Sequence, residues 1–110
     1  MAEVDGAARG GLELSEGAPG HYTAVIFGEL DIESVTRLND RVDQLLASPV
    51  SRLRFDLSDL EFMDSSGLGL LLRLTNQFGP APVHGARPLI RRVIEVSGLT
   101  GVLQLEPEAP

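Results

Sequence analysis

The most informative stretch of the chain is Phe62-Met63-Asp64-Ser65-Ser66-Gly67-Leu68-Gly69, which runs from a loop into a segment that is apolar on almost every side. A helix of that character is typical of the centre of a fold. Asp64 or Ser65 can cap the first helical turn, whose N–H groups and dipole can also receive an anion. The stretch therefore predicts either a plain helix cap followed by small packing residues or a serine that can carry a phosphate.

The residues before this stretch predict a hairpin, a helix and a strand. Residues 12–14 and 22–27 are rich in strand formers and flank a turn cluster of glycine and proline. A helix ending at Pro49 is predicted by a stripe of apolar residues at helical spacing, namely Val35, Leu38, Val42, Leu45 and Leu46. Residues 52–57 alternate strictly and predict a strand with one wetter side, followed by a short loop to Asp64.

The residues after it predict a weak strand, a helix and an edge strand. Residues 78–86 hold two prolines and two glycines where a strand is expected. Pro88 suits the first position of a helix, and Gly98 suits the residue that stops one. Residues 102–105 predict a last edge strand. This order indicates an α/β fold with a mixed sheet of four to five strands and about three packed helices.

Length and composition indicate one domain over residues 1–110, with a core at about 12–105 and tails at 1–11 and 107–110. The absence of cysteine excludes disulfides and thiolate zinc sites. The net charge of −7 disfavours direct binding to nucleic acid or anionic lipid. Because the sequence also shows no signal peptide and no apolar run of membrane-spanning length, we expect a cytoplasmic protein without membrane insertion.

Other polar residues predict no separate site. His21 and His84 are expected to be solvated or singly hydrogen-bonded. Arg54, in an otherwise apolar strand, is expected to pair with a carboxylate rather than to serve a site. Three arginines on the last helix either pair with acidic partner groups or, as we favour, cover its flank: Arg87, Arg91 and Arg92.

Metal binding and catalysis are not expected either. A run of carboxylates resembles a metal site but is split between a strand and a helix cap: Asp56, Asp59, Glu61 and Asp64. A serine nucleophile would need a base, an oxyanion site and a Gly-x-Ser-x-Gly elbow, and that elbow is missing. We therefore expect no metal, no cofactor and no enzymatic activity.

Four blocks of sequence stand together in a familiar order: Gly28-Glu29-Leu30-Asp31, Phe55-Asp56-Leu57-Ser58, the serine stretch at 62–69, and Val96-Ser97-Gly98-Leu99. In this combination the chain resembles the STAS domain family over about residues 12–105, and most closely its free-standing anti-sigma factor antagonists. The segment from Asp64 to Pro88 is shorter than the family pattern by roughly one helical turn. The far end of the second helix or the strand within residues 75–87 is therefore expected to differ.

The resemblance implies a module that binds an anti-sigma factor with a serine-kinase fold and thereby frees a sigma factor. The kinase would phosphorylate Ser65, which lowers affinity, and a phosphatase of the PP2C type would restore it. Residues expected to contact the partner are Asp31, Asp64, Ser66, Gly67 and Gly69. The alternative is a soluble STAS subunit of an ABC-type lipid or anion transport complex.

Overall fold

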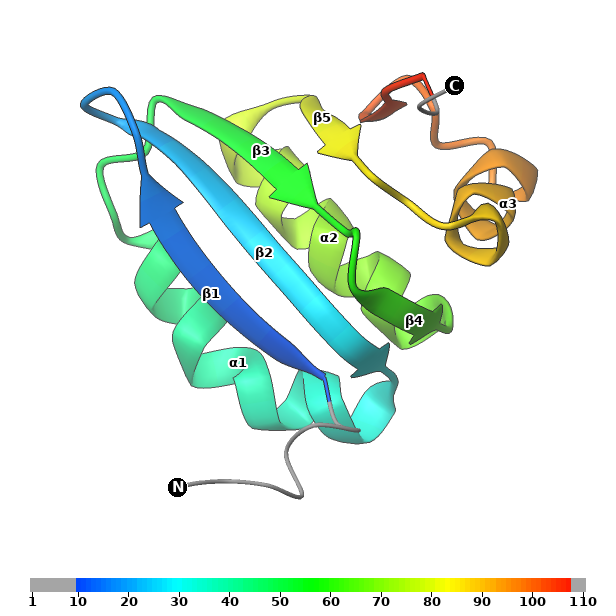
Figure 1. Cartoon of the computed structure of the whole chain (residues 1–110). Helices are drawn as coiled ribbons and strands as arrows, with labels where there is room; N and C mark the ends of the chain where they lie inside the picture. Colours follow the sequence, from blue (N-terminus) through cyan, green and yellow to red (C-terminus); the bar gives the residue numbers. More distant parts are fainter. Residues whose placement is uncertain (1–9, 108–110) are drawn as a thin grey trace.

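A computed structural model describes residues 10–107 of the chain. In these residues the chain forms, in order, β1 (Gly11–Glu16), β2 (His21–Leu30), α1 (Ile32–Leu46), β3 (Arg52–Asp56), β4 (Leu60–Met63), α2 (Ser65–Phe78), β5 (Ala81–His84), α3 (Pro88–Val96) and β6 (Leu103–Leu105) (Figure 1). The predicted hairpin, helices and mixed sheet are confirmed.

The sheet is mixed, with the strand order β1-β2-β3-β5-β6 and β4 paired to β2 outside this path. β1 is antiparallel to β2, and the other pairs are parallel. β2 is ten residues long, so its first half can pair with β3 and its last residues with β4. The five strands of the main path are the predicted ones, and β4 is the sixth.

The loop predicted between β3 and α2 is wrong at Leu60–Met63, which form β4. Leu60 and Met63 are buried and the two residues between them are exposed. This four-residue pattern does not alternate, and the strand is defined by its pairing with β2, about thirty residues earlier in the sequence. Local periodicity therefore gives no signal for it.

The core lies between one face of the sheet and the helices α1 and α2, which run side by side behind it in Figure 1. Phe55 and Ile26 of the sheet are almost fully buried, as are Val42 of α1 and Leu71 of α2. The helix α3 contacts β4 and buries Ile90 and Ile94. Within residues 10–107 no helix covers the other face of the sheet, and its side chains are partly open to solvent.

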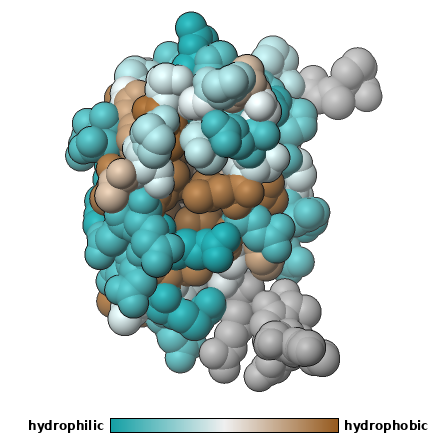
Figure 2. Space-filling view, turned by 90° about the vertical axis from the view of Figure 1, so that its left-hand side faces the viewer, coloured by the Kyte–Doolittle hydropathy of each residue, from teal (hydrophilic) through white to brown (hydrophobic). Residues whose placement is uncertain are grey.

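The burial of the residues in the apolar stripe on α1 follows the sequence prediction. Leu38, Val42 and Leu45 are buried, and Val35 and Leu46 are partly buried against the core. Figure 2 views the side of the molecule that carries β1 and α1, where apolar surface shows between polar side chains. The stripe thus fixes which face of α1 packs on the sheet.

The expected tails lie mostly outside the described residues. The exceptions at the N-terminal end are Gly10 and Gly11, which belong to the fold: Gly11 begins β1 and Gly10 is buried. A side chain at Gly11 would collide with the ring of Phe27 on the paired strand. Glycine at position 11 thus makes room for the ring of Phe27 in its present position, although glycine-rich sequence is also typical of tails. No helix within residues 10–107 has the length and apolar character needed to cross a bilayer.

Candidate functional site

Two helix starts lie next to each other at one edge of the sheet. β2 ends at Leu30 and β4 ends at Met63, and these two residues are partners in the parallel register. The residue after each strand, Asp31 and Asp64, is the N-cap of the following helix. The N–H of Asp64 donates to the carbonyl of Leu30 at 3.4 Å. The fold thus brings together the two aspartates that the sequence analysis placed at the site.

The cap of α2 is Asp64 and not Ser65. One carboxylate oxygen of Asp64 accepts hydrogen bonds from the N–H groups of Ser66, at 2.9 Å, and Gly67, at 3.3 Å. Ser65 is the first helical residue, and its side chain is exposed. Within the described part of the chain its hydroxyl makes no hydrogen bond, so the site presents a free hydroxyl beside a carboxylate.

The cap of α1 has a different first turn. Asp31 accepts from the N–H of Ser34 at 3.0 Å, and this bond is the main cause that holds the pKa of Asp31 below its ordinary value. Ser34 is buried, and its hydroxyl donates to the carbonyl of Glu29 at 2.8 Å and accepts from the N–H of Gly10 at 3.3 Å. The serine in this turn is a structural connector between β1 and α1.

The two glycines predicted at the site differ in their surroundings. A Cβ on Gly67 would lie 2.5 Å from the carbonyl oxygen of Leu30 and 2.7 Å from Cγ of Met63. Glycine is therefore needed at position 67 for the start of α2 to approach the ends of β2 and β4. A Cβ on Gly69 would meet nothing within 4 Å among the described residues. Gly69 leaves the helix backbone open on its outer side.

Two apolar side chains that the sequence analysis did not single out border the site. Ile32, the first residue of α1, is 69% exposed, and Phe62 of β4 is 42% exposed. Ile32 lies outside the apolar stripe of α1, so its exposure could have been predicted from the sequence. Phe62 pairs in register with Glu29 and so faces away from the core side taken by Met63. Its exposure depends on β4, which local pattern did not reveal.

The surface around Ser65 is acidic. Besides the two capping aspartates, the exposed carboxylates of Glu29, Glu33 and Glu61 belong to β2, α1 and β4 near their ends at this edge. The ion pairs formed by residues 10–107 lie elsewhere, and none involves Asp31 or Asp64. An anion added at Ser65 would lie beside the carboxylate of Asp64, which forms no ion pair within residues 10–107.

The remaining polar residues pair away from this edge. Arg54 pairs with Glu106 at 3.2 Å, as expected of a charge paired with a carboxylate, and His84 contacts the same carboxylate at 3.0 Å. Asp56 accepts from the N–H and hydroxyl of Ser58. In the described residues no three histidine, aspartate or glutamate side chains gather closely enough to hold a metal.

Two of the three arginines singled out at α3 contact backbone carbonyls. Arg87 donates to the carbonyl of Ser58 at 3.0 Å, and Arg91 donates to the carbonyl of Glu106 at 2.8 Å. Both contacts hold the flank of α3 against neighbouring segments, as in the interpretation favoured from the sequence.

A family model described as "Mlab, STAS domain" matches residues 18–105, most of the chain. The chain belongs to the STAS domain family. An anti-sigma-B factor antagonist of Listeria monocytogenes is 22% identical to it over 99 residues, covering 86% of this chain and 87% of the relative. An anti-sigma F factor antagonist of Paenibacillus polymyxa is 31% identical over 94 residues, covering 77% and 80%.

Solved structures show the same STAS fold. The unphosphorylated anti-sigma factor antagonist SpoIIAA has a TM-score of 0.73 at 25% identity, covering 89% of this chain and 90% of that one. The phosphorylated form of SpoIIAA, from Bacillus, has a TM-score of 0.67 at 25% identity, covering 89% and 93%. An anti-sigma factor antagonist from Mycobacterium paratuberculosis has a TM-score of 0.76 at 23% identity, covering 98% and 92%. The family resemblance and the α/β fold expected from sequence are confirmed.

Proposed function

We propose that this chain is an anti-sigma factor antagonist that binds an anti-sigma factor with a serine-kinase fold and loses affinity when Ser65 is phosphorylated. The observation that carries the proposal is the exposed, unbonded hydroxyl of Ser65 at the start of α2. The names of the STAS relatives and the phosphorylated form of SpoIIAA support it. Action in the cytoplasm and a single domain over the whole chain stay predictions.

The partner would dock on the edge where the two capped helices begin. We define the docking surface as the exposed or partly exposed side chains Asp31, Ile32, Phe62, Asp64, Ser65 and Ser66, together with the open backbone at Gly69. The apolar pair supplies area that is favourable to bury, and the polar groups supply orientation. Gly67 is buried, so its contribution is to place the start of α2 and not to contact the partner.

Phosphorylation would change the charge of this surface without local compensation. A phosphoserine carries about −1.5 to −2 charges at neutral pH. The N–H groups of Ser66 and Gly67, which could have received it, already donate to Asp64. The new charge would face the carboxylates of Asp31 and Asp64, so docking would require the desolvation of a crowded anionic patch.

The chain itself would supply the acceptor and not the catalyst. Within residues 10–107 the hydroxyl of Ser65 has no hydrogen bond to a histidine or carboxylate that could act as a base, and nucleophilic catalysis needs one. The kinase partner would transfer the phosphoryl group from ATP to the Ser65 oxygen, whose proton leaves. A PP2C-type phosphatase would hydrolyse the ester and restore the neutral surface. Both steps need the exposed position that Ser65 has.

The test is phosphorylation of the full chain by a cognate kinase-type anti-sigma factor, with ATP, followed by mapping of the phosphate by mass spectrometry. We expect one phosphate on Ser65, no phosphate on Ser65→Ala, and full phosphorylation of the matched control Ser15→Ala, which changes an exposed serine of β1 outside the docking surface. Phosphate on another residue, or none, would refute the mechanism. A transporter ATPase that copurifies in place of the kinase would instead favour the alternative, a STAS subunit of a lipid or anion transport complex.

A further inference from the structure

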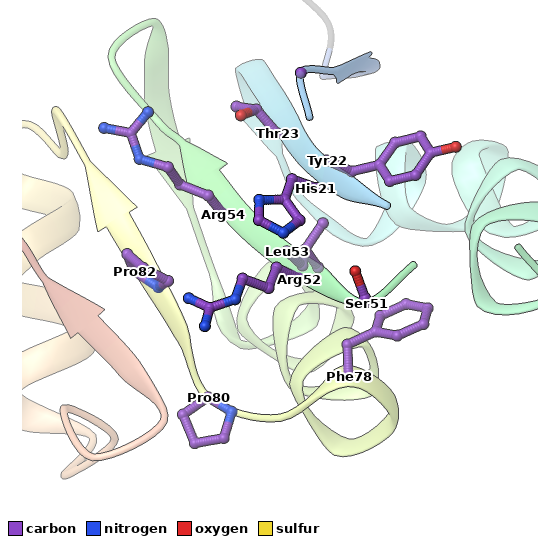
Figure 3. A pocket seen from close by; sticks show the side chains of 11 residues that line it. His21, Tyr22, Thr23, Ser51, Arg52, Leu53, Arg54, Phe78, Pro80 and Pro82 are labelled. Carbon is purple, nitrogen blue, oxygen red and sulfur yellow. The ribbon is translucent and has the colours of Figure 1, made fainter. Parts of the chain in front are cut away.

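A cleft opens at the end of the sheet opposite to Ser65. It lies at the starts of β2 and β3 and beside the segment that connects α2 to β5. Its volume is about 430 Å³. That volume falls within the range of small-molecule sites, about 300–1,000 Å³. Figure 3 shows Arg52 extending from β3 toward Pro80 and Pro82, with the ring of His21 above the same strand. His21 and Arg52 are neighbours in the strand register.

The cleft exists because β3 and β5 separate at this end. Their ladder begins only at Phe55 with Val83. The N–H of Ala81 and the carbonyl of Val83 bond toward β6, and the carbonyl of His84 bonds toward β3. By the alternation of backbone groups along a strand, the nitrogen of Pro82 faces β3, where it has no hydrogen to donate. The hydrogen bond that a residue other than proline would donate from position 82 to β3 is therefore missing at the end of the ladder where the cleft lies.

The lining of the cleft holds two arginines, although the protein has a net charge of −7. Its lining among the described residues contains His21, Arg52 and Arg54, with the hydroxyls of Thr23 and Ser51, and no aspartate or glutamate. The guanidinium of Arg54 is held by two hydrogen bonds to Glu106 at the rim. The guanidinium of Arg52 has neither a hydrogen bond nor an ion pair with any described residue. Arg52 is thus a cation left free in a cleft without carboxylates.

The floor of the cleft is apolar. Phe78 at the end of α2 and Leu53 of β3 are buried or partly buried, and Pro80 and Pro82 form the wall on the β5 side. A guanidinium donates a planar fork of N–H groups that matches phosphate and carboxylate oxygens. The cleft therefore places a guanidinium that can bind an anionic group beside an apolar wall that can contact the rest of a ligand.

We infer that this cleft binds a small organic anion in which a phosphate or carboxylate group is attached to an apolar ring or chain. The head would lie against Arg52, and the body against Pro80 and Pro82, toward which Arg52 extends. This site is separate from the docking surface, at the other end of α2, and its occupancy does not depend on the proposed function.

The test uses calorimetry and amide NMR shifts of the full chain with phenyl phosphate as the probe. We expect saturable binding, with shifts at the starts of β2 and β3 and around Phe78. Arg52→Gln is expected to weaken binding at least about tenfold, the effect of losing a charge-assisted hydrogen bond. The matched control is Arg41→Gln, which removes the same charge from the exposed surface of α1 and is expected to bind as the wild type does.

Three further probes separate the parts of the inference. Inorganic phosphate is expected to bind more weakly than phenyl phosphate, because it lacks the apolar body, and phenol is not expected to bind. Benzoate in place of phenyl phosphate tells whether the head is a carboxylate or a phosphate. Equal affinity of the wild type and Arg52→Gln, or shifts centred on Ser65, would overturn the inference, as would the absence of binding by both phenyl phosphate and benzoate.

Discussion

The two helix starts at the ends of β2 and β4 share one capping chemistry and differ in where they place a serine. Each is capped by an aspartate in extended conformation, Asp31 for α1 and Asp64 for α2. In α1 the serine is the third helical residue, which turns toward the core and joins the carbonyl of Glu29 to the N–H of Gly10. In α2 the serine is the first helical residue and points into solvent.

The comparison shows that two positions in a helical turn separate a buried structural hydroxyl from one exposed to solvent. At the third position α1 has Ser34, where α2 has Gly67 in contact with the end of β2. At the first position α1 has the exposed Ile32, where α2 has Ser65. Aspartate is the cap in both helices, so the cap alone does not mark the site. What differs between the two helix starts is the position of the hydroxyl relative to the core.

The largest expected effect concerns the third position. Gly67→Ala forces a Cβ against the carbonyl of Leu30 and should lower the free energy of unfolding by about 2–3 kcal/mol, since close-packed sites do not take added atoms. Gly69→Ala is the matched control, and it should raise stability by up to about 1 kcal/mol through helix propensity. Urea unfolding followed by circular dichroism measures both. Equal effects of the two substitutions would contradict the close approach at Gly67.

The next effect separates the two serines. Ser34→Ala removes a buried hydroxyl and leaves the carbonyl of Glu29 and the N–H of Gly10 without this partner, which should cost about 1–2 kcal/mol of stability. Ser65→Ala should change stability by less than about 0.5 kcal/mol. The same unfolding experiment tests the pair. A destabilised Ser65→Ala protein would show that this hydroxyl has a structural role after all.

The cap of α2 gives a smaller effect. Asp64→Ala frees the N–H groups of Ser66 and Gly67 and should cost about 1 kcal/mol. Asp64→Asn keeps an oxygen acceptor and should lower the free energy of unfolding by only a few tenths of a kcal/mol. Differential scanning calorimetry compares the two melting temperatures. Equal melting temperatures would mean that the cap contributes nothing to the stability of α2.

The smallest effect is the pH dependence at Asp31. Because the hydrogen bond from Ser34 lowers the pKa of Asp31 in the folded protein, its contribution to stability is present above the ordinary value of 3.8 and is lost as pH falls through the lowered pKa. Asp31→Asn keeps an acceptor but does not titrate. Between about pH 5 and pH 3 the wild type should therefore lose more stability in urea than this variant does.

The comparison itself controls for the other acids. Asp56 and Glu106 also have lowered pKa values, and they are the same in the wild type and in Asp31→Asn, so the difference between the two proteins reports on position 31. Identical acid dependence of the two proteins would contradict the assigned role of the Ser34 hydrogen bond.

The sequence predicted what is local. The residues Asp-Ser-Ser-Gly predicted a capped helix start, and the apolar stripe predicted the buried face of α1. Gly98, with φ of 73°, follows α3 as expected. The sequence left open whether Asp64 or Ser65 is the cap, because both residue types favour that position. Only the hydrogen bonds of Asp64 decide between them.

The features that the sequence did not predict depend on distant residues. β4 pairs with the far half of β2, and the exposure of Phe62 follows from that pairing. The carboxylate that holds Arg54 is Glu106, which lies 52 positions later in the chain. The cleft beside Arg52 depends on the ladder between β3 and β5, which begins only at Val83. The prolines predict this late start only once the two strands are known to be neighbours.

The most direct test of the central claim is the affinity of the anti-sigma factor for the chain carrying phosphoserine at position 65, measured by calorimetry beside the unmodified chain and Ser65→Ala. The account predicts equal affinity for the unmodified chain and Ser65→Ala, and an affinity about a hundredfold weaker for the phosphorylated chain. Equal binding of the phosphorylated and unmodified chains would contradict it.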